Sequence, residues 1–456
     1  MISRSSLARS AHQAVRRSGS VKPLHRAFAS AASTSTYQSS DVSGIKVASR
    51  DDHGPTTKLA VIAKAGTRYQ PLPGLTFGLE GFAFKNTQRR SALRINRESE
   101  LLGGQLTTSH TREAVILEAS FLREDLPYFV ELLGEVVSMT KYTTHEFHEE
   151  VERVLHLKEA SVGADARTLA LDGAHAVAFH TGLGAALEPT STTPYHKYLS
   201  EEHIASYADV VYSKPNIAVV ADGASAENVS QWVNRFFQDV PAAARSGQVL
   251  KTEASKYYGG EQRTSFPAGN AMVIAFPGSD YSASKPEIAV LAALLGGQSS
   301  IKWSTGFSLL SKSAAGISGL SASASNLAYS DAGLLAVQLS GPAASVRKGA
   351  EETVKALKSI SEGSVTKEDL AKAIASVKFD ALTAGQLRGA SIAQAGTGLI
   401  HGGKAFESAA VADAFASVTA DKLKTTAKAL LDGKASVSTV GDLFVLPYAE
   451  ELGLRV

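Results

Sequence analysis

The stretch LAVIAKAG (Leu59–Gly66) decides the fold, because a second version of it, AMVIAFPG (Ala271–Gly278), occurs later in the chain. Each is a short apolar run of the kind that forms a buried strand. The first is followed by the turn-forming TRYQPLPG and then a helix-like segment. The second leads through SDYSASKPE into the helical IAVLAALLGG. A repeated strand, turn and helix indicates an internal repeat.

Three further blocks recur in the same order. The Thr/Ser-rich GGQLTTSHTREAVILEASFL from Gly103 is repeated by GLSASASNLAYSDAGLLAVQL from Gly319. TTHEFHEEVERVLHLKEA from Thr143 and VTKEDLAKAIASVKFDAL from Val365 each predict a helix that is opened by Thr and an early acid. LSEEHIASYADVVYSKPNIAVVADG from Leu199 matches VTADKLKTTAKALLDGKASVSTVGD from Val418, a capped helix that leads to a strand.

The spacing between matching positions is nearly constant. The offsets are 211 (Gly66 to Pro277), 216 (Gly103 to Gly319), 223 (Thr143 to Thr366) and 220 (Asp222 to Asp442). Four blocks in one order at a nearly constant offset predict a tandem duplication. We therefore expect an α+β fold with two homologous domains, residues 37–245 and 246–456, joined by a linker over Val240–Ser255. Each domain should have a mostly antiparallel sheet with helices packed on one face.

The N-terminal segment differs from the rest in charge. Residues 1–40 contain six basic residues and no acid, and Ser and Thr are frequent there. The basic residues are Arg4, Arg9, Arg16, Arg17, Lys22 and Arg26. Removing them takes the formal charge from +2 to 2 − 6 = −4. A basic, Ser-rich, acid-free segment without a long apolar centre is typical of a mitochondrial transit peptide, which we predict over residues 1–36, with cleavage after Phe28 or somewhat later.

The composition excludes several kinds of chemistry. The chain has no cysteine, which excludes disulfides, thiol catalysis, Cys-ligated zinc and iron–sulfur clusters. Its longest apolar run, IAVLAALL (Ile288–Leu295), is far shorter than the roughly 18–20 residues that span a bilayer. A formal charge of +2 gives no indication of a nucleic-acid partner.

One acid stands inside an apolar run, Glu80 in GLTFGLEGFAFK (Gly74–Lys85). This segment resembles the zinc-binding helix of the pitrilysin-like metallopeptidases, which carries the motif H-x-x-E-H. In that motif the two His side chains hold zinc and the Glu activates a bound water. Here Phe77 and Gly81 stand at the His positions, so the resemblance gives a degenerate motif of Phe77, Glu80 and Gly81. The family's third ligand, a Glu, would fall near Glu159. The resemblance therefore implies no catalytic residue, no metal and no cofactor, and Glu80 is interpreted as a relic or as an acid that faces solvent or a partner.

The run HEFHEE (His145–Glu150) is a second candidate metal site. His145, His148, Glu149, Glu152 and His156 share one helical face, and that spacing alone could bind a metal. The apolar residues Phe147, Val151, Val154 and Leu155 lie on the opposite face and are sufficient for a core-facing stripe. We interpret the polar face as solvated.

Within the pitrilysin-like family the chain resembles a branch without peptidase chemistry, the core subunits of mitochondrial ubiquinol–cytochrome c reductase (respiratory complex III). Four segments carry this resemblance: Gly103–Glu113, Lys256–Arg263, Ile301–Leu310 and Asn326–Val337. It implies a structural subunit needed for assembly and stability, peripheral to the inner membrane on its matrix side. The implied partners in the dimeric complex are core protein 1, cytochrome b, cytochrome c1 and the Rieske protein.

The alternative is the non-catalytic α-type subunit of a mitochondrial processing peptidase, which also lacks zinc ligands. That subunit carries a long glycine-rich loop. At the corresponding place this chain has LLGGQSSIKWSTGFS (Leu294–Ser308), with one Gly pair before Ile301. The short loop favours a core subunit. A free-standing metallopeptidase would need ligands that Phe77 and Gly81 cannot supply.

Overall fold

The computed structural model describes residues 36–163, 165–189, 198–282, 284–297 and 304–456. Its contacts divide the chain into two units, 1–36 and 37–456, and the architecture below is that of the second. The predicted transit peptide therefore lies almost entirely outside the described residues. Below, residues 37–245 are called the first half and residues 246–456 the second half.

The first half contains a six-stranded sheet in the order β1-β2-β6-β3-β5-β4. Its strands are β1 (Gln38–Val42), β2 (Ile45–Arg50), β3 (Thr56–Ala63), β4 (Gln105–His110), β5 (Val115–Leu122) and β6 (Ile217–Asp222). All neighbours are antiparallel except β2 and β6, which run parallel. The apolar run quoted first is β3, which lies in the middle of the sheet and pairs with both β5 and β6.

The second half contains a five-stranded sheet in the order β7-β11-β8-β10-β9. Its strands are β7 (Gly260–Ser265), β8 (Ala271–Pro277), β9 (Ser321–Ala328), β10 (Gly333–Ser340) and β11 (Ser436–Gly441). The order repeats β2-β6-β3-β5-β4 strand for strand, and its one parallel pair, β7 with β11, corresponds to β2 with β6. The duplication and the mostly antiparallel sheets predicted from the sequence are confirmed.

Helices follow the strands in matching order. In the first half they are α2 (Leu75–Phe82), α3 (Ala92–Leu101), α4 (Leu126–Met139), α5 (Thr144–Glu146), a π-helical turn η2 (Phe147–Glu152), α6 (Arg153–Val162), α7 (Ala166–Phe179), α8 (Glu201–Val211) and α9 (Ala226–Phe236), with short 3-10 turns η1 (Arg123–Asp125), η3 (Gly182–Gly184) and η5 (Lys214–Asn216). In the second half they are α10 (Pro286–Leu295), α11 (Leu309–Ala315), α12 (Ala343–Glu362), α13 (Lys367–Gln386), α14 (Arg388–Gly402), α15 (Ser408–Phe415) and α16 (Ala420–Asp432). The predicted Thr caps are present, since the Thr143 and Thr366 side chains accept from the backbone N–H groups of Glu146 and Asp369.

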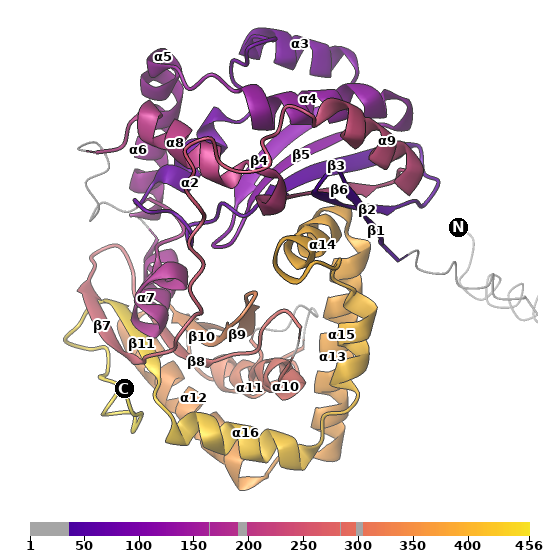
Figure 1. Cartoon of the computed structure of the whole chain (residues 1–456). Helices are drawn as coiled ribbons and strands as arrows, with labels where there is room; N and C mark the ends of the chain where they lie inside the picture. The colour runs from indigo at the N-terminus through magenta and orange to yellow at the C-terminus, as the bar shows by residue number, and fades with distance from the viewer. Residues whose placement is uncertain (1–35, 164, 190–197, 283, 298–303) are drawn as a thin grey trace, which may run out of the picture. The chain divides into compact units, whose positions relative to one another are not determined.

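Helices cover both faces of each sheet, so the prediction of one covered face is wrong. One face of each sheet packs on helices of its own half in a large apolar core. The other face packs on a helix from the opposite half (Figure 1): α7 lies on β8, β10 and β11, and α14 lies on β2, β3 and β6. The reason is that strands such as β3 are apolar on both faces, and the second face needs a partner.

Each crossing helix approaches its sheet through a glycine. A methyl group at Gly396 of α14 would lie 2.5 Å from Cδ1 of Ile62 on β3. Gly173 of α7 is in the same position against Ser438 of β11, where a Cβ would overlap the hydroxyl. Small residues at these two points allow the helices to lie directly on the strands. Each half therefore supplies one helix to a smaller apolar cluster on the second face of the other half's sheet.

Candidate functional site

The degenerate motif lies on α2, which begins after Gly74 in the left-handed conformation (φ 92°). Most of this helix is buried, including Phe77, which is 4% exposed. Gly81 faces η2, and a Cβ there would lie 3.1 Å from Cγ2 of Val151. At the positions of the two His ligands the structure thus has a buried aromatic ring and a tightly packed glycine.

Glu80 is held by two basic side chains. It makes an ion pair with Nδ1 of His110, the last residue of β4, and its Oε1 lies 3.7 Å from Nζ of Lys158 on α6. Its side chain is only 17% exposed. The interpretation of Glu80 as an acid that faces solvent is therefore wrong, because its carboxylate is the centre of an ionic cluster.

The cluster extends to the segment after η3. Nε2 of His110 lies 2.8 Å from the carbonyl oxygen of Leu187, and Nζ of Lys158 lies 3.5 Å from Oε2 of Glu188. Lys158 also lies over the ring of Phe77, 4.9 Å from its centroid, in a cation–π contact. Lys158 thus lies between Phe77, which stands at a His ligand position, and the carboxylates of Glu80 and Glu188.

The surroundings of His110 favour its charged form. Both ring nitrogens face acceptors, a carboxylate and a carbonyl, so both hydrogen bonds need an N–H. Burial alone would lower the pKa of His110, but the Glu80 carboxylate and the Leu187 carbonyl raise it above its ordinary value. Burial likewise would raise the pKa of Glu80, and the bonds and charges of His110 and Lys158 lower it instead. An imidazolium and an ammonium therefore face one carboxylate.

These residues do not fit a zinc ion. A zinc site needs three or four donor atoms, and Phe77 and Gly81 have none to offer. The residue that reaches Glu80 from the helix of the expected third ligand is Lys158, the neighbour of Glu159. A cationic ammonium next to Glu80 repels a metal ion instead of ligating it.

In the second candidate, HEFHEE, the two His side chains lie on the surface. His145 pairs with Glu149 at 3.3 Å and His148 with Glu152 at 2.8 Å, and both imidazoles are more than half exposed. In the part of the chain that the structure describes, no group of three or more His, Asp or Glu side chains is placed to hold a metal. Phe147, Val151 and Leu155 are buried as predicted, but Val154 is 43% exposed, so the core stripe is narrower than expected.

Sequence reasoning missed His110, Lys158 and Glu188. His110 ends a strand of alternating Thr and Ser, and Lys158 and Glu188 look like ordinary surface charges in the sequence. The only signal was the unexplained acid itself, because a buried carboxylate requires a partner. That signal does not say where in the chain the partner lies.

Comparison with known proteins gives the family of the chain. Residues 46–191 match the family model described as insulinase (peptidase family M16), and residues 198–377 match the model of the peptidase M16 inactive domain. These two matches show that the chain belongs to the class of proteins built from M16-type domains in tandem.

Full-length relatives narrow that class. The chain is 58% identical over the whole of both sequences to cytochrome b-c1 complex subunit 2, mitochondrial, of Neurospora crassa. It is 37% identical to the subunit of the same name from Cryptococcus neoformans var. grubii, over 95% of this chain and 98% of that one. It is also 28% identical to the mitochondrial-processing peptidase subunit alpha of Solanum tuberosum, over 56% of this chain and 50% of that one. The chain therefore belongs to the M16 (insulinase) family, in the branch of the mitochondrial cytochrome b-c1 complex subunit 2 proteins.

Proposed function

We propose that this chain is a structural core subunit of mitochondrial respiratory complex III, needed for assembly and stability of the complex and without redox or peptidase chemistry of its own. The observation that carries the proposal is the 58% identity to a complex III subunit over the full length of both chains. Similarity over the whole length supports a common role better than similarity confined to one domain.

The degenerate motif, Phe77, Glu80 and Gly81, supports the absence of peptidase chemistry. A peptidase of this type needs Glu80 to share a water with a zinc ion. Here the carboxylate is neutralised by His110 and Lys158, which together bring two positive charges to the place where a metal dication would act. Glu80 then has a structural role: it ties α2 to β4 and α6.

The proposed partners and location depend on the proposed membership of the complex. We propose contacts with core protein 1, cytochrome b, cytochrome c1 and the Rieske protein in a dimeric assembly, peripheral to the inner membrane on its matrix side. Residues 1–36 would be the transit peptide that directs import. Among the described residues, no helix combines the length and the apolarity needed to cross a membrane. Exposed apolar side chains such as Leu101, Phe379 and Phe444 are available for contacts with other subunits.

A second candidate is the α-type subunit of a processing peptidase, favoured by the 28% identity to the potato protein. That match covers about half of each chain. The segment that should separate the two functions, Leu294–Ser308, lies partly outside the described residues, and its sequence contains one Gly pair.

Native electrophoresis of mitochondrial membranes in mild detergent, with mass spectrometry of the bands, tests the proposal. We expect this chain to migrate with cytochrome b, the Rieske protein and core protein 1. Deletion of the chain should also lower the amount of the assembled complex. Migration as a soluble pair with a subunit that carries H-x-x-E-H would overturn the proposal in favour of the processing peptidase.

A further inference from the structure

The second sheet has a free edge at a place where the first sheet is covered. In the first half, β1 pairs antiparallel with β2 and covers its outer edge. Strand β7 takes the place of β2 in the second half, but it is the outermost strand of its sheet (Figure 1). The residues before it, 248–259, form neither helix nor strand. Within the described residues, the second sheet therefore has no strand that corresponds to β1.

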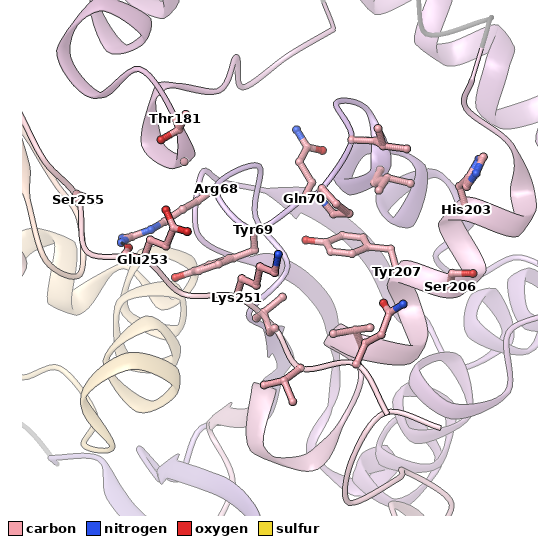
Figure 2. A pocket seen from close by; sticks show the side chains of 18 of the residues that line it. Arg68, Tyr69, Gln70, Thr181, His203, Ser206, Tyr207, Lys251, Glu253 and Ser255 are labelled. Carbon is pink, nitrogen blue, oxygen red and sulfur yellow. Dashed lines mark hydrogen bonds between the residues drawn. The ribbon is translucent and has the colours of Figure 1, made fainter. Parts of the chain in front are cut away.

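The segment before β7 cannot supply such a strand, because it is bound to the first half. The carbonyl oxygen of Glu253 accepts a hydrogen bond from the Arg68 guanidinium at 2.8 Å. Figure 2 shows Arg68, Glu253 and Ser255 together in the lining of a cavity of the first half. Strand β1 and its turn take up residues 38–44, whereas only residues 256–259 lie between Ser255 and β7. A strand beside β7 must therefore come from elsewhere.

Every second residue of β7 directs its backbone groups away from the sheet. The parallel ladder with β11 uses the even-numbered residues of β7, and at its start the N–H of Gly260 donates to the carbonyl oxygen of Ala435 at 3.0 Å. The N–H and C=O groups of Glu261, Arg263 and Ser265 therefore point outwards. No described residue forms a hydrogen bond with these backbone groups. A row of unpaired donors and acceptors of this kind is a template for a further strand.

Exposed aromatic side chains lie around this edge. Tyr258, two residues before β7, is 38% exposed, and the loop after β11 carries Phe444 and Tyr448, which are 101% and 52% exposed. This loop lies next to β7, because Arg263 donates to the carbonyl oxygen of Leu443 at 3.0 Å and lies over the ring of Tyr448. Exposed aromatic rings beside unpaired backbone groups are typical of an interface.

The charges of β7 decide which partner strand fits its edge. When two copies of β7 pair antiparallel, outward-pointing residues must face one another, so the ladder is centred on a residue and not between two residues. Centring on Glu261 or on Arg263 places like charges directly opposite each other, which is unfavourable. Centring on Gln262 pairs residues 260–264 and places Glu261 of each copy opposite the partner's Arg263. The strand is therefore complementary to itself in one register.

We propose that β7 pairs with β7 of a second copy of this chain, in an antiparallel ladder centred on Gln262. One such contact satisfies both free edges, because the same surface is used on both copies. A ladder of five residues is small beside the roughly 1,200 Å² of a stable interface. We therefore expect the pairing in the assembled complex, and to that extent the inference rests on the proposed function, since a dimeric complex III brings two copies together.

Cysteine cross-linking in mitochondrial membranes tests the proposal, because the chain has no cysteine of its own. In the proposed register the two copies of residue 262 form a non-hydrogen-bonded pair with Cα atoms about 4.5 Å apart, a distance that a disulfide bridges. After mild oxidation, we expect Gln262→Cys to give a disulfide-linked dimer in denaturing electrophoresis without reductant. Mass spectrometry of the band should show this chain alone.

The matched control is Ser265→Cys. Its two copies would lie about 20 Å apart in the same register, so we expect at least about tenfold less dimer. Gln262 and Ser265 are both exposed, so neither substitution should disturb the fold. Equal dimer yields from the two variants, no dimer from Gln262→Cys, or a product with another subunit in its place would overturn the proposal.

Native electrophoresis of the same membranes separates this result from the proposed function. If the Gln262→Cys chain migrates with cytochrome b but forms no dimer, the pairing of β7 is wrong and the proposed function stands. If the chain migrates without cytochrome b, the proposed function is wrong. The pairing of β7 is then still decided by whether Gln262→Cys gives the dimer in the band that holds the chain.

Discussion

Arg68 and Asp331, 263 positions apart in the sequence, form an ion pair in which Nη2 and Oδ2 are separated by 2.6 Å. The same guanidinium donates to Oε1 of Glu113 at 2.8 Å and to the carbonyl oxygen of Glu253 at 2.8 Å. Asp331 in turn accepts from the backbone N–H of Ser255 at 2.8 Å. One arginine therefore joins the first half, the second half and the segment between them.

The first prediction is that Arg68→Met destabilises the chain by about 3 kcal/mol or more. The Arg68 and Glu113 side chains are 4% and 2% exposed, so removing the guanidinium leaves a buried carboxylate without its counter-charge. Burial already raises the pKa of Glu113, despite the opposing effects of Ser330 and Arg68, which indicates how poorly the site tolerates that charge. The free energy of unfolding in urea measures the loss.

The matched control for this measurement is Arg347→Met. Arg347 pairs with Glu451 at 2.6 Å, but both side chains are more than 40% exposed. A pair of that kind contributes about 0–1 kcal/mol. Equal losses from the two variants would contradict the role given to Arg68.

The second prediction concerns the contact between α14 and the first sheet. Alanine usually stabilises a helix relative to glycine by up to about 1 kcal/mol. At Gly396 we expect the reverse, a loss of about 1–3 kcal/mol, because the added methyl would lie 2.5 Å from Cδ1 and 2.6 Å from Cγ1 of Ile62. Thermal and urea unfolding of Gly396→Ala measure the effect.

Gly402 provides the control on the same helix. A Cβ at Gly402 would meet no atom within 4 Å, so Gly402→Ala should be neutral or slightly stabilising. If Gly396→Ala proved as harmless as Gly402→Ala, the two halves would not be in the close contact described here.

The sequence predicted the duplication because matching blocks fold into matching strands. The quoted runs became β3 and β8, and the Thr-capped segments became helices that begin after Thr143 and Thr366. What the sequence could not predict is the exchange of helices between halves. The last five residues of strand β3, Leu59–Ala63, are all apolar, and that pattern predicts cover on both faces but does not say which helix supplies it.

As with the fold, only part of the candidate site could be predicted from the sequence. The motif position gave Phe77, Glu80 and Gly81, because these residues are close together in the sequence. The partners of Glu80 come from β4 and α6, 30 and 78 positions further on, and their approach depends on the tertiary fold. A Lys and a His among many surface charges carry no local signal of such a contact.

The third prediction is a pH dependence that originates in the Glu80–His110 pair. The pKa of His110 is raised on folding, so its contribution to stability is complete below its unfolded value of about 6.5 and is lost as the pH rises through the folded value. The pKa of Glu80 is lowered, so its contribution is lost as the pH falls below about 4.5. The pair therefore stabilises the fold most between these two values.

We expect His110→Gln to cost about 1.5–3 kcal/mol near pH 5.5 and distinctly less near pH 9, measured as free energies of unfolding in urea. His148→Gln serves as the control, because the pair of His148 with Glu152 is exposed and should contribute little at either pH. A cost for His110→Gln that increased towards pH 9 would show that His110 is neutral in the folded chain.

The fourth prediction concerns His175 on α7, which is fully buried. The two hydrogen bonds of its ring suit a neutral imidazole. Its Nδ1–H donates to the carbonyl oxygen of Leu171 at 2.8 Å, and its Nε2 accepts from the Tyr329 hydroxyl at 2.7 Å. Burial, with the nearby charge of Arg112, lowers the pKa of His175 to about 3. Between about pH 6.5 and pH 3 only the unfolded chain binds this proton, so stability falls as the pH is lowered through that range.

The size of this effect is measurable by comparison with His175→Gln, which has no titrating group at this position. One proton contributes about 1.4 kcal/mol per pH unit, so the parent chain should lose about 2 kcal/mol relative to the variant between pH 6.5 and pH 5. The comparison uses the change with pH in each protein, because the substitution also alters the hydrogen bond with Tyr329. The ring of His110 faces two hydrogen-bond acceptors, whereas the ring of His175 faces one acceptor and one hydroxyl donor. Because of this difference, the two buried histidines respond to pH in opposite directions. Parallel pH profiles for the parent chain and His175→Gln would mean that His175 takes up its proton in the folded state, and would refute the neutral assignment.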